Sequence, residues 1–331
     1  MKIGEKEIAW ELLPQEQFRE LFRRAVGGET LEKHGISFPA IGFGLNVSYD
    51  DPGFEPLLRE KFGLRIPYNS APHLTFVRDY GRLGFELPYK HYGYVSDTMD
   101  EALVFASSFG MFKSTISGYA SLFMESHGYV PAHASVLSAS GKGLLLTGGS
   151  AAGKTTTLLN LVDWLLVSGD PVGVLTDDWA IIAERGDGYI AKSFDPSVSL
   201  RQKNLDENQH LRFHCHENIQ RTVITQKKVS RSPDDLYGRP IGVERADVDV
   251  VILLLPEEGD GRLHRVDSSK FAKKVVDAAY HYPYVSADQI QRHEAFWVTL
   301  AQKIPIYSFS TRGNGDPSQS IDALKELIHG V

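Results

Sequence analysis

The stretch Gly148-Gly-Ser-Ala-Ala-Gly-Lys154-Thr155 matches the pattern G-x-x-x-x-G-K-[ST] at every fixed position. Glycine at Gly148 and Gly153 lets the backbone bend closely around phosphates, because no Cβ stands in the way. Successive backbone N–H groups and the positive end of a following helix then favour an anion. Lys154 supplies a cation for the β- and γ-phosphates, and the Thr155 hydroxyl supplies an oxygen for Mg²⁺. The stretch therefore predicts a phosphate-binding loop for a nucleoside triphosphate, ATP or GTP, together with Mg²⁺.

The segments on both sides of this loop have the composition that such a loop requires. The apolar residues Leu144–Thr147 predict a buried strand before it, and Lys154–Val167 predict a helix after it. The alternative is a glycine-rich turn without a ligand, which the complete motif in this context disfavours. We expect the nucleotide to contact the whole loop, namely Gly148, Gly149, Ser150, Ala151, Ala152, Gly153, Lys154, Thr155 and Thr156.

Two adjacent carboxylates follow the next apolar segment. Val172–Thr176 predicts a buried strand that ends in Asp177 and Asp178. In phosphate-loop proteins, a carboxylate in this position holds the metal. One carboxylate would bind Mg²⁺ directly or through water, and the second would accept a proton from an attacking hydroxyl. The alternative is that both residues only form a turn, as aspartate often does.

A histidine strand and a glycine turn precede the loop. His133 lies on a strand predicted over Tyr129–Ala139, and Gly141-Lys-Gly143 predicts a tight turn that would bring His133 beside the loop. A lone histidine on a strand is more often structural. In order, however, the histidine strand, glycine turn, apolar strand, phosphate loop and Asp177-Asp178 resemble the HPr kinase/phosphorylase family and, more distantly, phosphoenolpyruvate carboxykinases. The resemblance covers residues 129–193 and includes Gly188-Tyr-Ile-Ala-Lys192.

The resemblance implies an α/β fold with a mixed-sheet phosphate-loop domain of the HPr kinase/phosphoenolpyruvate carboxykinase type, and a role for each site residue. Lys154 and Thr155 would hold the triphosphate. Asp177 would be the general base of phosphoryl transfer, Asp178 and Thr155 would hold Mg²⁺, and His133 would support Asp177. The sequence leaves open whether Asp177 and Asp178 exchange these roles.

The chain also departs from HPr kinases. Thr156 stands where those enzymes carry an acidic residue, and the spacing from Lys154 to the acidic pair is longer. We therefore expect an ATP- or GTP-dependent, Mg²⁺-dependent kinase with another acceptor, either a small molecule or a serine of a peptide. Two alternatives stay open: a nucleotide-binding regulator or ATPase without an organic acceptor, and a carboxykinase-like lyase. HPr kinases form oligomers, so the resemblance also implies a homo-oligomer.

Length and pattern predict two domains. A chain of 331 residues is long for one core. We expect an N-terminal α+β domain over residues 1–124, of unknown role, and an α/β domain with a mixed sheet over residues 125–331. The expected elements of the first are a helix over Gln15–Arg24, strands over Ile36–Tyr49, His73–Asp79, Leu83–Leu87 and His91–Val95, and a helix over Thr98–His127. Those of the second, beside the loop, are strands over Trp179–Glu184, Tyr189–Ser193, Val250–Leu255 and Ile304–Ser308 and helices over Ser268–Tyr280, Ala287–Gln302 and Ile321–Ile328.

Composition and charge limit the class of protein. The chain is 42% hydrophobic and 23% charged, which is enough apolar material for a sizeable core. Its net charge of −7 disfavours a general nucleic-acid binder. With one cysteine, Cys215, no internal disulfide is possible, and the N-terminus has no signal-peptide pattern. We expect a cytoplasmic protein with neither a nucleic-acid nor a membrane partner.

Other side chains give weaker signals. Arg201 and Lys192 could clamp the γ-phosphate, although a solvated surface explains them equally well. Asp249 begins an apolar run rather than ending one, so this run predicts a core strand. Three further groups have simpler explanations. A solvated face explains the basic residues Arg221, Lys227 and Lys228, the spacing of His210, His214, Cys215 and His216 matches no zinc pattern, and core packing explains the aromatic run Tyr280–Tyr284.

Overall fold

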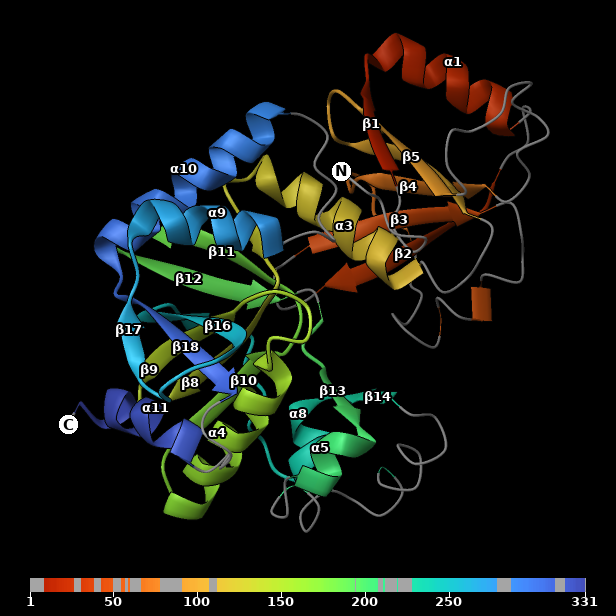
Figure 1. Ribbon diagram of the computed structural model, residues 1–331. Coiled ribbons are helices and arrows are strands. Elements are labelled where there is room, and N and C mark those ends of the chain that lie inside the picture. Colours follow the sequence, from red (N-terminus) through yellow and green to blue (C-terminus); the bar gives the residue numbers. More distant parts are fainter. Residues whose placement is uncertain are drawn as a thin grey trace. The chain divides into compact units, whose positions relative to one another are not determined.

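The structure is a computed structural model that describes residues 9–26, 31–38, 43–49, 55–56, 59, 67–77, 91–106, 112–193, 195–207, 211, 219, 228–278, 287–312 and 319–330. The chain forms two compact units (Figure 1). Unit 1 comprises Met1–Tyr129 and His281–Gln291, and unit 2 comprises Val130–Tyr280 and Arg292–Val331. The sheets contain both parallel and antiparallel pairs and alternate with helices, which confirms the predicted α/β class with mixed strand directions.

Unit 1 is built on a six-stranded mixed sheet. Its strands are β1 (Ala9–Leu13), β2 (Lys33–Phe38), β3 (Phe43–Tyr49), β4 (His73–Val77), β5 (His91–Ser96) and β6 (Glu101–Ala106), and its helices include α1 (Gln15–Val26) and α3 (Phe112–Glu125). The strand order is β1-β5-β6-β4-β3-β2. Helix α1 is amphipathic, and its buried side chains Phe18, Leu21 and Ala25 pack in one apolar cluster with Leu103 and Phe105 of the sheet.

The helix predicted over Thr98–His127 is wrong in its first part. Residues 101–106 form β6, which lies between β5 and β4 in the sheet, and α3 begins only at Phe112. Residues 102–105 are all buried, and so short an apolar run cannot be assigned to helix or strand by periodicity alone. Asp97, just before the predicted helix, lies in the turn between β5 and β6. Pairing with β5 and β4 in the sheet therefore determines that residues 101–106 form a strand and not a helix.

Two other predictions in unit 1 change or cannot be checked. The single strand expected over Ile36–Tyr49 is replaced by β2 and β3, which pair antiparallel with each other. The strand expected over Leu83–Leu87 lies outside the described residues. The helix at Gln15–Arg24 and the strands near His73 and His91 agree with the structure to within two residues.

Unit 2 contains two sheets, a two-stranded ribbon and several helices. Its strands are β7 (Val130–Ala132), β8 (Ala134–Ala139), β9 (Lys142–Thr147), β10 (Val172–Thr176), β11 (Ala180–Arg185), β12 (Gly188–Ser193), β13 (Val198–Arg201), β14 (Lys228–Arg231), β15 (Arg245–Asp247), β16 (Val250–Glu258), β17 (Leu263–Arg265) and β18 (Ile306–Arg312). Its helices include α4 (Lys154–Ser168), α5 (Gln202–Glu207), α8 (Pro233–Tyr237), α9 (Ser268–Ala278) and α11 (Gln319–His329), and α10 (Ala287–Lys303) has residues in both units.

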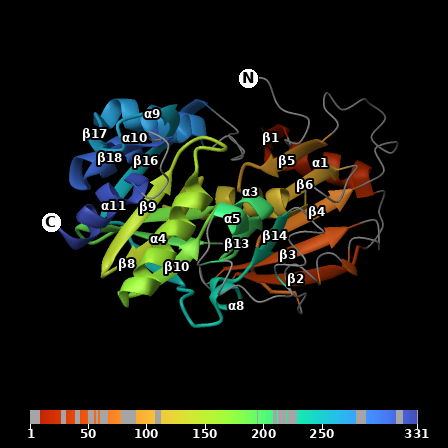
Figure 2. The same cartoon turned by 60° about the horizontal axis from the view of Figure 1, so that its bottom comes forward.

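The larger sheet of unit 2 has the order β10-β8-β9-β16-β18-β17. Strand β9 runs parallel to β16 and antiparallel to β8. Helix α4 packs on β8, β9 and β10, and α11 packs on α4 and β18 (Figure 2). The second sheet, β15-β12-β11-β7, contacts β8, β9 and β10 through its own strands. Strand β9 is thus a central, buried strand, and the loop that follows it is held between a sheet and a helix.

The strand predicted over Tyr129–Ala139 is interrupted at His133. Strand β7 before it pairs with β11 in one sheet, and β8 after it pairs with β9 and β10 in the other. A tight turn joins β8 to β9, but it lies at Ser140 and Gly141 rather than over Gly141–Gly143, because Lys142 and Gly143 already belong to β9. Ser140 and Gly141 have φ values of 49° and 82°, as in the two-residue turns that suit hairpins. His133 therefore lies where the chain passes from one sheet to the other.

No helix within the described ranges is long and apolar enough to cross a bilayer.

Candidate functional site

The stretch Gly148–Thr155 connects the end of β9 to the start of α4. Gly148 has a φ of 149°, and a Cβ at this position would lie 2.5 Å from the backbone oxygen of Leu254 on β16. Gly153 has a φ of 93° and is the N-cap of α4. Both positions therefore need glycine for conformational reasons, and at Gly148 also because a neighbouring strand is close. The loop between them exposes Gly149, Ser150 and Ala151 to solvent.

The first turn of α4 is suited to an anion. The N–H groups in the first turn of a helix have no carbonyl partner within the helix, and they carry the positive end of its dipole. No side chain caps this helix start with a hydrogen bond, and its first turn contains no acidic residue. This combination is the one found where phosphates bind to helix N-termini.

Lys154 is held inside the loop. Its side chain is 7% exposed, and its Nζ donates to the backbone oxygens of Gly148 (2.9 Å) and Gly149 (3.1 Å). Burial lowers the pKa of Lys154 to about 8, against the opposing influence of Asp178 and Asp177, which favour the charged form. The ammonium group is thus positioned at the loop, and its charge depends on pH near neutrality.

Asp177 is buried and points at the start of α4. It is 3% exposed, and its Oδ2 accepts hydrogen bonds from the Thr155 hydroxyl (3.1 Å) and the Ser199 N–H (2.9 Å). The Ser135 hydroxyl donates to its backbone oxygen (2.8 Å). The Asp177 carboxylate is therefore held from β13 and α4, and its backbone from β8.

Asp178 has a different environment from its neighbour. Its side chain is 49% exposed, whereas the side chain of His133 is 8% exposed, and His133 Nε2 lies 3.3 Å from Asp178 Oδ1. The Ala134 N–H donates to the backbone oxygen of Asp178 (3.2 Å), and the Thr147 hydroxyl donates to that of His133 (3.3 Å). The sheet crossing at His133 thus brings the histidine to the second aspartate.

The sequence gives no signal for two further contacts of this site. Asn204 on α5 is 8% exposed, and its Nδ2 donates to the Thr156 Oγ1 (3.4 Å). Ser199 on β13 reaches Asp177 through its backbone N–H. These residues lie 48 and 22 positions from their partners, and no motif links them. Only the folded chain places the segment Val198–Glu207 beside the start of α4.

The remaining candidates are placed as follows. Arg201 is exposed on β13, and Lys192 is half-buried on β12. Asp249 accepts from the Gly143 N–H (2.7 Å), near the end of β9 opposite to the loop, which agrees with a core strand after it. Within the described ranges no group of three or more His, Cys, Asp or Glu side chains gathers around a common point. Outside the described residues lie His210, His214, Cys215, His216, Arg221, Lys227 and Tyr280–Tyr284, and of Lys228 only the backbone in β14 is described.

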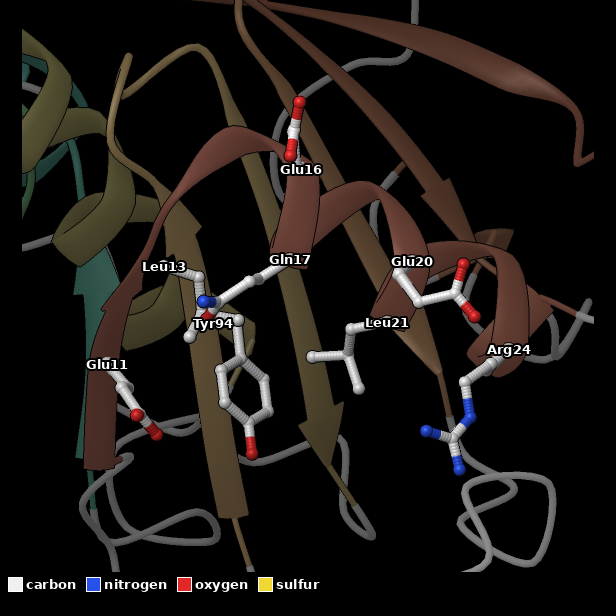
Figure 3. A pocket seen from close by; sticks show the side chains of 8 residues that line it. All are labelled: Glu11, Leu13, Glu16, Gln17, Glu20, Leu21, Arg24 and Tyr94. Atoms are coloured by element: carbon white, nitrogen blue, oxygen red, sulfur yellow. The ribbon is translucent and has the colours of Figure 1, made fainter.

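Unit 1 has a separate open hollow of about 510 Å³ beside α1 (Figure 3). Three carboxylates, Glu11, Glu16 and Glu20, and one cation, Arg24, line it together with Tyr94. Burial, and secondly Glu11, raise the pKa of Tyr94. The carboxylates would repel the phosphates of a nucleotide, so this hollow does not compete with the loop in unit 2 as a phosphate site.

No protein-family model matches this chain, and no curated protein has a significantly similar sequence.

Proposed function

We propose that this chain is a Mg²⁺-dependent phosphotransferase that moves the γ-phosphoryl group of ATP or GTP to the hydroxyl of a small molecule or of a peptide serine. One observation carries the proposal. The last residue of a complete phosphate-loop motif, Thr155, donates to a buried carboxylate, Asp177, while the next residue, Asp178, is half-exposed and paired with His133. We infer that Asp177, beside the Thr155 hydroxyl, would bind the metal and that its neighbour Asp178 would act as the base.

The environments of the two aspartates favour an exchange of the roles that the family resemblance implies. The Thr155 hydroxyl and the Asp177 carboxylate are oxygen ligands of the kind Mg²⁺ prefers, and their separation of 3.1 Å suits a shared cation. Mg²⁺ is usually held by one or two carboxylates and by substrate phosphates, so a larger ligand cluster is not required. We assign Thr155 and Asp177 to the metal and Asp178 to the acceptor proton.

His133 supports Asp178 in this assignment. A general base must be reachable by its substrate, and Asp178 is the more exposed of the two carboxylates. The imidazole of His133 lies 3.3 Å from one oxygen of the Asp178 carboxylate and orients it, while half of the Asp178 side chain stays exposed to an acceptor. His133 is a positioning residue in this scheme, because its partner is the carboxylate.

Lys154 and the loop would carry the electrostatic part of the reaction. Phosphoryl transfer depends mainly on positioning and on neutralising charge that spreads over the transferred group. Bound Mg²⁺ would neutralise charge on the β- and γ-phosphate oxygens. The N–H groups at the start of α4 would hold the phosphates in place, and the Lys154 ammonium would move from the carbonyls of Gly148 and Gly149 to the phosphates.

The same residues support the finer expectations about class and setting. The order of His133, hairpin, phosphate loop and acidic pair favours a domain of the HPr kinase type, with a different acceptor because Thr156 replaces the acidic residue. The single cysteine and the net charge of −7 favour a cytoplasmic protein that acts on small molecules or proteins rather than on nucleic acid. A homo-oligomer is proposed on the resemblance alone.

The proposal is tested by a transfer assay with γ-labelled ATP or GTP, Mg²⁺ and pooled hydroxyl metabolites and serine peptides. We expect a labelled product with the unaltered chain. Asp178→Asn should reduce the rate by about 10²–10⁴-fold while the Mg²⁺-nucleotide still binds. Asp177→Asn should weaken the Mg²⁺ dependence of binding itself.

Three outcomes would count against parts of this account. Nucleotide hydrolysis without any labelled acceptor would favour an ATPase or a nucleotide-dependent regulator. Carboxylation of phosphoenolpyruvate would favour a lyase. Full transfer activity in Asp178→Asn, with loss in Asp177→Asn, would restore the roles that the resemblance implies.

A further inference from the structure

The segment Val198–Glu207, formed by β13 and α5, contacts the candidate metal site at two points. The Ser199 N–H donates to Asp177 Oδ2, the same oxygen that accepts the Thr155 hydroxyl. Asn204 Nδ2 donates to the Thr156 Oγ1 in the first turn of α4 (3.4 Å). One short segment therefore contacts both Asp177 and the first turn of α4, which would supply the two protein ligands of the cation.

Asn204 is fixed at both ends of its side-chain amide. Its Oδ1 accepts from the Arg201 N–H (2.9 Å), while its Nδ2 faces Thr156. It is buried, whereas its neighbours Gln202 and Lys203 are exposed. Burying an amide is unfavourable unless it is hydrogen-bonded, and these two bonds satisfy that requirement. The amide therefore forms a direct link between β13 and α4.

Thr156 follows Thr155 directly, so the orientation of one limits that of the other. A helix residue held by its side chain fixes the rotation of the first turn about the helix axis. Thr155 then has its hydroxyl on the side of Asp177, where the pair is 3.1 Å apart.

We propose that Asn204 is a positioning residue for the Mg²⁺ site. Through Thr156 it holds the first turn of α4 so that the Thr155 hydroxyl faces Asp177. This inference rests on the proposed function, because it concerns the metal of the same site. Groups that orient metal ligands typically change metal affinity 10–100-fold when they are removed.

The test measures binding of a fluorescent ATP analogue at increasing Mg²⁺ concentration and, separately, in EDTA. The variants are Asn204→Ala, Thr156→Val and their combination. Gln202→Ala is the matched control, because Gln202 lies on the same helix, is exposed and bonds to Asp206. Thermal unfolding of each variant monitors folding.

We expect Asn204→Ala and Thr156→Val each to raise the half-saturating Mg²⁺ concentration roughly tenfold. Asn204→Ala, which lies outside the loop, should leave the nucleotide affinity in EDTA unchanged. The double variant should do no more than either single one, because both remove the same contact. Gln202→Ala should behave as the unaltered chain.

Several results would overturn the inference. Single variants with unaltered Mg²⁺ dependence, effects that multiply in the double variant, or an equal loss of nucleotide affinity of Asn204→Ala in EDTA would each show that the contact does not orient the metal ligand. If the unaltered chain binds no nucleotide in Mg²⁺ or EDTA, the proposed function fails first and this inference falls with it.

Discussion

At the residue scale, Lys154 has to satisfy two opposite requirements. A buried lysine is favoured when it is neutral, whereas a phosphate site needs it charged. Burial lowers its pKa, Asp178 and Asp177 oppose this by favouring the charged form, and the net result is a pKa of about 8. Burial also separates Asp177 from Asp178. The first carboxylate is buried and the second is half-exposed, so only the second can be reached readily by an acceptor.

The lowered pKa predicts how nucleotide affinity depends on pH. Below about pH 8 Lys154 is protonated and can bind phosphate directly. Above that value the neutral amine must take up a proton on binding, so affinity should fall as pH rises, by up to about tenfold per pH unit. Equilibrium titrations with ATP from about pH 7 to about pH 9.5 would measure this.

Lys154→Arg provides the control for this titration. Arginine stays charged throughout the range, so the variant should bind more weakly but with a flat pH profile between about pH 8 and pH 9.5. An equally flat profile in the unaltered chain would show that Lys154 does not control nucleotide binding in the way described.

At the element scale, the connection from β9 to α4 depends on close packing of the loop against β16. Gly148 lies against the carbonyl of Leu254, and Gly153 takes a left-handed conformation that ends the loop and starts the helix. The sequence predicts β9, the loop and α4 well, because the signal for each lies within a short contiguous segment: an apolar run, a glycine pattern and a run of helix-forming residues. The sequence predicts helix for residues 101–106, but they form β6, because pairing with the neighbouring strands β5 and β4 determines their structure rather than the local pattern.

Gly148→Ala tests the conformational requirement of the loop. The added Cβ would meet the Leu254 oxygen at 2.5 Å with φ at 149°, so we expect a loss of about 1–3 kcal/mol in the free energy of unfolding. Gly149→Ala is the matched control, since a Cβ there meets nothing within 4 Å, and its change should stay within about 0.5 kcal/mol. Urea unfolding of both variants gives the comparison, and equal losses would contradict the packing argument.

At the scale of the whole molecule, sequence order and compact units do not coincide. The segment His281–Gln291 belongs to unit 1, although the chain on both sides of it belongs to unit 2. Within unit 1, Gln289 is 1% exposed and its Nε2 donates to the carboxylate of Glu125 at the end of α3. A contact across 164 positions has no local signature, and the same is true of Ser199 and Asn204 at the candidate site. The sequence predicts the motif residues, and the fold supplies their partners.

Gln289→Ala should destabilise unit 1. Loss of a buried hydrogen bond to a charged group, and of the packing around it, should cost about 1–3 kcal/mol. Gln291→Ala, an exposed glutamine on the same helix, should be close to neutral. Thermal unfolding of the two variants would show the difference, and identical midpoints would mean that the Glu125 contact contributes nothing to the stability of this unit.

The most direct test of the central claim is calorimetric titration of the purified chain with ATP and with GTP, with and without Mg²⁺. If the loop Gly148–Thr155 binds the phosphates and Asp177 binds the metal, at least one nucleotide should bind saturably at one site, and Mg²⁺ should raise its affinity. Lys154→Ala should weaken binding at least about tenfold, and Asp177→Asn should remove the Mg²⁺ effect. Absence of binding by either nucleotide, or binding that neither variant changes, would contradict the assignment of this loop as a nucleotide site.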